Sequence, residues 1–193
     1  MAAPLGPMGV LCMKRTLSHG RRSGFITGLG IATVDALYGS VAALGLTFII
    51  AFIIQYSQII QVLGIFVLVY LGVSVYREKP RKLSLENNAP VKLLTDYTSS
   101  VALTICNPIT ILSFMGALAA LDVVGGLGKG SGFSLVGGIF LGSLSWWLIL
   151  SLALSSVRRA LTRRQQVAIN KIAGSIIFLF ALTLAIRVAI LIL

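Results

Sequence analysis

Five long apolar segments, separated by short charged ones, dominate this sequence. They cover residues 23–54, 59–76, 97–121, 133–157 and 169–193, and a shorter apolar segment covers residues 1–13. A helix needs about 20 residues to cross the hydrocarbon layer of a membrane, so each long segment is long enough or nearly so. Open strand edges are not tolerated in lipid. The sequence therefore predicts an all-α polytopic membrane protein.

The composition excludes the common soluble classes. Of the 193 residues, 57% are hydrophobic and 11% are charged, whereas ordinary globular domains are roughly 45–50% apolar and about 25% charged. Fifteen of the sixteen lysines and arginines lie between or at the ends of the apolar segments, and Arg187 lies inside the last one. They lack the interleaved aromatic residues on which bases stack. We therefore expect the lipid bilayer to be the partner, and no nucleic acid.

The basic residues predict an orientation. The connections at 14–22, 77–96 and 158–171 hold four, five and five of them, whereas 55–58 holds none and 122–132 holds one. Loops rich in lysine and arginine stay in the cytoplasm. We therefore expect these three connections to be cytoplasmic loops of a multi-pass membrane protein.

An internal repeat divides the chain. Gly24-Phe25 and Gly30-Ile31 recur with the same spacing as Gly132-Phe133 and Gly138-Ile139. We interpret residues 1–193 as one transporter domain, with repeat 1 at about 1–79, a linker at about 80–96 and repeat 2 at about 97–193. Each repeat holds three spans, so the second enters the membrane from the opposite side. The predicted fold is a six-helix bundle of two inverted repeats, an arrangement found in secondary transporters.

The repeat also predicts that the first helix is truncated at its N-terminus. Gly6-Pro7 aligns with Asn107-Pro108. The segment that holds Pro108 begins at residue 97, whereas only residues 1–6 precede Pro7. We expect the true start to lie upstream of Met1.

Asp35 is the strongest candidate for a functional residue. Counted from Ser23 at the helical rise per residue, it lies about 18 Å into the membrane. A lone carboxylate at that depth is costly, and it is by default a candidate proton carrier or a partner for a substrate's amino group. The alternative is a structural acid that pairs with Arg187 or with hydroxyl groups. Arg187 itself is expected either to reach the outer headgroups or to form this ion pair.

The two proline positions are candidates for substrate binding. Pro7, after Gly6, and Pro108, after Asn107, each remove an amide donor and interrupt the helical hydrogen bonds. The freed carbonyls and half-helix ends can bind ions or a substrate's carboxylate. The alternative is a kink that only shapes packing.

Four further features are predicted to act at mid-membrane or in packing. Tyr70 and Ser143 count to about the middle of the membrane, where they could line a cavity or form interhelical hydrogen bonds. Ser143 is the repeat counterpart of Asp35. The glycine pairs Gly24/Gly28 and Gly138/Gly142 are expected to allow close helix packing within the bundle, with a dimer face as the alternative.

A family resemblance runs through nearly the whole chain in order. The residues that carry it are Gly6-Pro7, Gly20-Arg21-Arg22-Ser23-Gly24, Gly28-Leu29-Gly30-Ile31, Asp35, Gly45-Leu46, Tyr70-Leu71 and Asn107-Pro108. They resemble the LysE/RhtB family of amino-acid exporters. The resemblance implies a small bacterial inner-membrane protein that exports amino acids or similar metabolites. Leu5 and Ile109 depart from the family, which usually has proline and often lysine there.

No catalytic or metal-binding motif is present in the sequence. His19 is the only histidine, Cys12 and Cys106 lie in apolar segments, and residues 125–132 lack the Lys-Ser/Thr of a phosphate-binding loop. We therefore expect neither an enzyme nor a cofactor or metal site. The leading hypothesis is a secondary exporter driven by the proton gradient, with a homo-oligomer left open. The alternatives are a non-transporting membrane subunit that assembles with a partner and an exporter of a metal cation.

Overall fold

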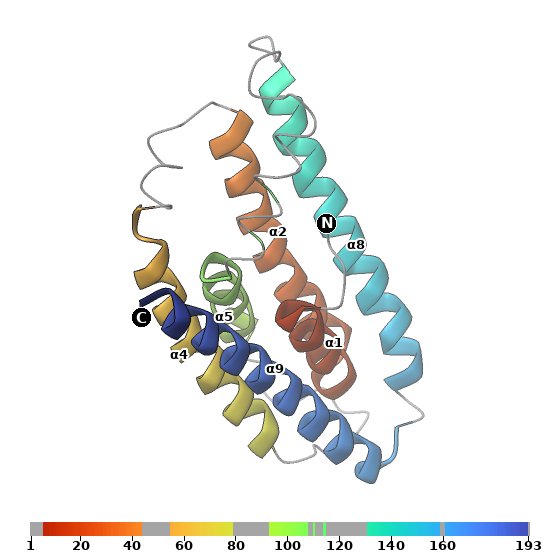
Figure 1. The fold of residues 1–193 in the computed structure, drawn as a ribbon. Helices are drawn as coiled ribbons and strands as arrows, with labels where there is room; N and C mark the ends of the chain where they lie inside the picture. The colour runs from red at the N-terminus through yellow and green to blue at the C-terminus, as the bar shows by residue number, and fades with distance from the viewer. Residues whose placement is uncertain are drawn as a thin grey trace.

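The structure of the chain is a computed structural model, and it describes residues 6–43, 55–78, 93–107, 110, 114, 131–158 and 161–192. Within these ranges the regular structure consists of helices (Figure 1). They are α1 (Pro7–His19), α2 (Arg21–Ala43), α4 (Ser57–Arg77), α5 (Leu93–Ile105), α8 (Ser131–Arg158) and α9 (Arg163–Ile192). Of these, α2, α4, α8 and α9 are long and apolar enough to cross a membrane. The predicted all-α polytopic fold is confirmed.

The connection predicted at 14–22 is wrong, because α1 continues through most of it. Lys14 and Arg15 lie inside α1, and Gly20 alone separates α1 from α2. Gly20 has a φ of 98°, which favours glycine, and its N–H donates to the carbonyl of Thr16. The two basic side chains are not in solvent because they pair with acids from other parts of the chain, as described below.

The helix ends at the two predicted breaks follow from proline. Pro7 is the first residue of α1, where a missing N–H costs nothing because that group has no partner inside the helix. α5 ends at Ile105, shortly before Pro108, because the residue preceding a proline avoids helical backbone angles. The Asn107 N–H donates to the Thr104 carbonyl at 3.3 Å, which tightens the last turn. Pro108 lies outside the described residues.

The described parts of the three basic segments meet at one end of the bundle, the lower end in Figure 1, which we call the basic end. Lys14 of α1 pairs with Glu78 at the end of α4, and Arg15 pairs with Asp96 near the start of α5. Arg158, the last residue of α8, donates to the carbonyl of Ser18. The described residues of all three segments therefore lie on one side, in agreement with the predicted topology.

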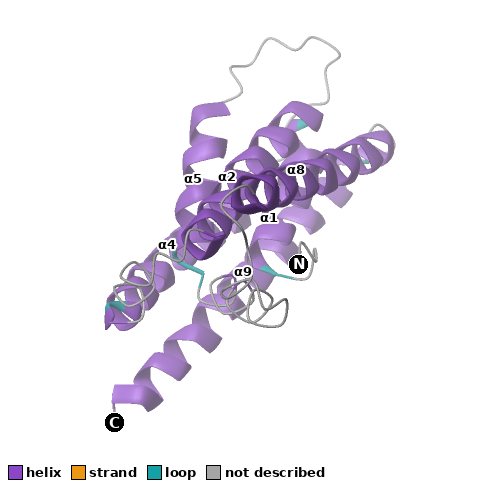
Figure 2. Cartoon of the chain, turned by 90° about the horizontal axis from the view of Figure 1, so that it is seen from above, coloured by secondary structure: helices purple, strands orange, loops and turns teal. Residues whose placement is uncertain are grey.

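Helices at equivalent positions of the two repeats pack antiparallel. Along α2 and α8, Gly39 lies against Ile139 and Gly28 against Trp147, so one helix ascends while the other descends. α4 and α9 pack in the same sense, with Gly72 beside Phe178 and Tyr76 beside Gly174. Seen from above, α1, α2 and α8 gather in one group, and α4 and α9 lie to the other side (Figure 2). Antiparallel pairing of equivalent helices is the arrangement that an inverted repeat predicts.

The glycine pairs differ in environment. A Cβ at Gly28 would come within 3.0 Å of the Trp147 Cβ, and one at Gly24 would come equally close to the Thr16 hydroxyl. Close packing by this pair is confirmed. Gly138 and Gly142 are exposed on α8, and a Cβ there would meet nothing within 4 Å in the described part of the chain. Close packing by this second pair therefore stays a prediction, with a dimer face as its alternative.

Large apolar side chains cover the outside of the bundle as well as its core. The buried cluster joins α1, α4, α5 and α9 through residues such as Leu11, Leu71, Leu103 and Ile177. On the outer surface, Phe66, Phe133 and Ile190 are each more than two-thirds exposed. Exposed apolar surface on this scale suits helices that face lipid rather than water.

Candidate functional site

The central feature of the site is a hydrogen bond between Asp35 of α2 and Ser143 of α8, which we call the central pair. The Ser143 hydroxyl donates to Asp35 Oδ2 at 2.6 Å. The two residues are 8% and 9% exposed. They are also repeat counterparts. Equivalent residues of two repeats related by a two-fold axis contact each other only near that axis, so the contact between Asp35 and Ser143 agrees with the predicted repeat.

The central pair lies deep in the bundle. α2 begins at Arg21 and α8 ends at Arg158, both at the basic end. Counted from these residues at the helical rise per residue, Asp35 and Ser143 lie about 21 and 22 Å from the basic end. The two counts agree, and they place the carboxylate near the middle of both helices.

The predicted alternative partner, Arg187, does not reach Asp35. Arg187 is exposed on α9, and none of the ion pairs among the described residues includes it. Asp35 instead accepts a hydrogen bond from the hydroxyl of Ser143. A structural acid that pairs with a hydroxyl group was one of the two forms of the predicted alternative. The exposure of Arg187, near the far end of α9, agrees with a side chain that reaches the headgroups.

The start of α1 and the end of α5 lie side by side. The Thr104 hydroxyl, in the last turn of α5, contacts the sulfur of Met8 at 3.3 Å, and Met8 directly follows Gly6 and Pro7. Gly6, the residue before α1, has no side chain that could cap the helix start. A helix start carries partial positive charge and a helix end carries partial negative charge. Complementary partial charges therefore lie next to each other at the two predicted breaks.

Tyr38 connects this region with the central pair. It lies one helical turn after Asp35, and its hydroxyl donates to the carbonyl of Ile105 at 3.0 Å. Gly64 of α4 approaches the same place, because a Cβ there would lie 2.6 Å from the Cys106 carbonyl oxygen. Asn107, shortly beyond Ile105, is half-buried. Tyr38 thus links the helix that carries Asp35 to the end of α5, and the contact between Thr104 and Met8 links that end to the start of α1.

Tyr70 lies away from this region. Its side chain is 72% exposed, whereas the buried residues of α4 are Gly64, Leu68, Leu71, Gly72 and Val75. These recur every three or four positions and form one helix face, and Tyr70 projects from another face. The depth of Tyr70 along the helix was predictable from the sequence, but the direction of its side chain was not.

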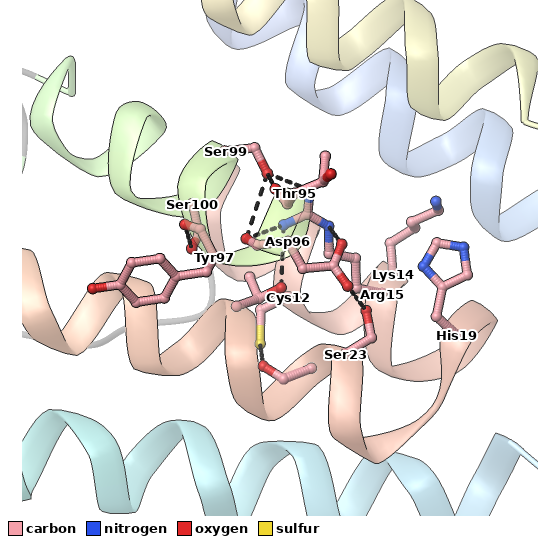
Figure 3. A network of polar contacts seen from close by, with 12 residues as sticks. Cys12, Lys14, Arg15, His19, Ser23, Thr95, Asp96, Tyr97, Ser99 and Ser100 are labelled. Atoms are coloured by element: carbon pink, nitrogen blue, oxygen red, sulfur yellow. Dashed lines mark hydrogen bonds and ion pairs between the residues drawn. The ribbon is translucent and has the colours of Figure 1, made fainter. Parts of the chain in front are cut away.

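Sequence reasoning missed a buried polar network at the basic end (Figure 3). Arg15 Nε lies 3.1 Å from Asp96 Oδ1, and the two side chains are 8% and 9% exposed. Ser23 donates to the other carboxylate oxygen at 2.5 Å, and Arg15 donates to the hydroxyls of Thr27 at 3.1 Å and Ser99 at 2.6 Å. The network joins α1, α2 and α5. Its paired charges explain how an arginine can be buried there.

A second set of charges lies beside it. The Glu78 carboxylate accepts from Lys14 and from His19, the latter at 2.7 Å. Asn170 of α9 donates to the Glu78 carbonyl at 3.0 Å. Burial raises the pKa of Glu78, but the hydrogen bond from His19 and the charge of Lys14 outweigh it, so the pKa lies at about 2. We call Lys14, Arg15, His19, Ser23, Glu78 and Asp96 together the basic-end network.

The signal for this network was present in the sequence but weak. The chain has only five acids against sixteen basic residues, and two of those acids, Glu78 and Asp96, flank the predicted linker. Treating 14–22 as a loop assigned Lys14 and Arg15 to solvent. Ser23 and Thr27, spaced four apart on one face of α2, were the remaining clue to a polar partner. Within the described residues, no group of three His, Cys, Asp or Glu could hold a metal ion.

Comparisons with known proteins agree with the geometry. A family model described as LysE type translocator matches residues 1–188. A relative from Escherichia coli (strain K12), described as an uncharacterized membrane protein and called YahN, is 30% identical over 176 residues. That alignment covers 89% of this chain and 78% of the relative. No solved structure matches the chain significantly.

Proposed function

Because this chain belongs to the LysE type translocator family, we propose that it is a secondary exporter of amino acids or related small metabolites, driven by the proton gradient. Membership of the family makes it a membrane exporter of small molecules. Transport, rather than catalysis, is what members of the family do. The substrate class, the driving ion and an inner-membrane location belong to our proposal.

The observation that carries the proposal is the central pair. Asp35 is buried about 21 Å from the basic end, and its described partner there is the neutral hydroxyl of Ser143. A hydroxyl does not neutralise a carboxylate. The site can therefore accept a proton, or the ammonium group of a substrate, as a compensating positive charge. A purely structural bundle has no need for such a group.

The neighbouring helix ends supply the complementary half of an amino-acid site. The uncapped start of α1 attracts a carboxylate, and the end of α5 attracts an ammonium group. A free amino acid carries both groups close together. The buried indole N–H of Trp147, one turn from Ser143, has no hydrogen-bond partner in the described part of the chain. It offers one further donor near the central pair.

The basic-end network fits the role of a closed gate. Arg15 and Asp96 join α1 of the first predicted repeat to α5 at the start of the second. Lys14 and His19 join α1 to the end of α4. In alternating access, one repeat moves against the other around a central site. We propose that this network closes the cytoplasmic end in the present conformation and separates when that end opens.

The proposal is tested by measuring export from cells. Cells that produce the chain and matched cells that do not are loaded with each amino acid in turn, and the external concentration is followed over time. We expect faster export of one amino acid or a small chemically related group. If the chain is present in the membrane at normal level and no amino acid or related metabolite leaves faster, the proposed substrate class is wrong.

A further inference from the structure

A groove of about 400 Å³ runs along the outer surface between α4 and α9. Val73 of α4 and Phe178, Leu179 and Leu182 of α9 line its apolar part. The last three are each about half exposed. Its volume lies within the roughly 300–1,000 Å³ that is typical of small-molecule sites, so the groove is large enough for a defined ligand.

The groove has a polar end and an apolar end. Arg77, the last residue of α4, and Ser175 line it at the level of the basic end. Counted along α9 from Ser175 at the helical rise per residue, Leu182 lies about 10 Å further into the membrane. A ligand that fits must therefore carry a polar group at the membrane surface and an apolar chain that extends inward.

The polar end is positively charged. Arg77 is exposed, and no ion pair among the described residues includes it. The adjacent acid, Glu78, is already engaged by Lys14 and His19. Lys171 is exposed on α9, one turn from Ser175, and adds a second positive charge near the entrance. The ligand's polar group is thus expected to be an anion.

We propose that this groove binds one anionic phospholipid, with its phosphate on Arg77 and Ser175 and an acyl chain along Phe178 and Leu182. Basic pockets between membrane helices at the cytoplasmic side are suited to acidic headgroups. The match of charge at one end and apolar surface along the rest favours a lipid over a second copy of the chain. A second copy would bring another Arg77, or other side chains of a strongly basic chain, to the same surface.

The test is native mass spectrometry of the full chain in detergent, with phosphatidylglycerol and phosphatidylcholine of identical acyl chains supplied at equal concentrations. We expect one retained phosphatidylglycerol, with about a fivefold preference over phosphatidylcholine, which is the effect of about one basic side chain at a membrane surface. Arg77→Gln should abolish the preference. Ser175→Trp, which fills the groove without changing its charge, should reduce the retention of both lipids.

Arg22→Gln is the matched control, because Arg22 is exposed at the start of α2 and lies outside the groove. It should leave the preference unchanged. Equal retention of the two lipids by the unchanged chain would overturn the proposal, and so would equal losses in Arg77→Gln and Arg22→Gln. Displacement of the lipid by an equal concentration of inorganic phosphate would reassign the groove to free phosphate. A dimer that carries no lipid would reassign it to a second copy.

Discussion

At the scale of single residues, the central pair joins the two repeats through one hydrogen bond between buried groups. A hydrogen bond to a charged group contributes about 1.5–3 kcal/mol. We predict a coupling of that size between Asp35→Ala and Ser143→Ala in a double-mutant cycle on the free energy of unfolding, because each of these changes removes the hydrogen bond. The control is Ser40→Ala, because the Ser40 hydroxyl bonds to the Ala36 carbonyl on its own helix. If Asp35 couples to Ser40 as strongly as to Ser143, the hydrogen bond between Asp35 and Ser143 is contradicted.

The Glu78 carboxylate predicts a stability change at acid pH. Its pKa falls from 4.5 to about 2 on folding. A lowered folded pKa gives stability that is complete above the unfolded pKa and is lost as the pH falls towards the folded one. We therefore predict that the unchanged chain loses stability as the pH falls from 4.5 to about 2, and that Glu78→Gln removes this part of the pH dependence. Unfolding in detergent at pH 6, 4 and 3 measures it. Identical pH profiles for the two proteins would refute the prediction.

At the scale of helices, the contact between α2 and α8 depends on Gly28. A Cβ there would come within 3.0 Å of the Trp147 Cβ, so Gly28→Ala forces the helices apart. Overpacking of this kind costs typically about 1–3 kcal/mol, measured as the free energy of unfolding. Gly142→Ala is the matched control on α8, where a Cβ meets nothing within 4 Å among the described residues. It should be neutral or stabilising by up to about 1 kcal/mol, because alanine favours helix. Equal losses in the two variants would show that the contact is not close.

The helices and their ends were predictable where a local property of the sequence, a long apolar segment or a proline, determines them. The apolar segments predicted α2, α4, α8 and α9, and the proline at 108 predicted the interruption beyond Ile105. The sequence could not show that α1 continues to His19, because the burial of Lys14 and Arg15 depends on acids 64 and 81 positions away. The direction of the Tyr70 side chain was not predictable for a similar reason, since only the packing of α4 determines which face of that helix is buried.

At the scale of the whole molecule, the repeat was the most informative signal. It predicted that Asp35 and Ser143 are equivalent, and the structure places them in contact. The described residues of the three basic segments gather at one end, which agrees with the predicted alternation of spans. The basic-end network was not predictable, because its ion pairs join residues whose sequence neighbours resemble ordinary polar connections.

The orientation of the whole molecule is tested by labelling. We predict that Leu85→Cys, in the linker, is protected from an impermeant thiol reagent in intact cells, and that Leu127→Cys is labelled. The background carries Cys12→Ala and Cys106→Ala, so that each protein has one thiol. Both positions should react after the cells are opened. Labelling of the cysteine at 85 from outside intact cells would reverse the orientation.

The central claim is that Asp35 carries the response to the proton gradient. The direct measurement is the export rate per folded molecule in vesicles with an imposed pH gradient, using the amino acid identified in cells. Asp35→Asn keeps the volume and a hydrogen bond to Ser143 but removes the charge and the titration, whereas Asp35→Glu keeps a carboxylate. We predict that Asp35→Asn inserts at normal level and exports no faster than protein-free vesicles, while Asp35→Glu retains a measurable gradient response. Full gradient-driven export by Asp35→Asn would contradict the account.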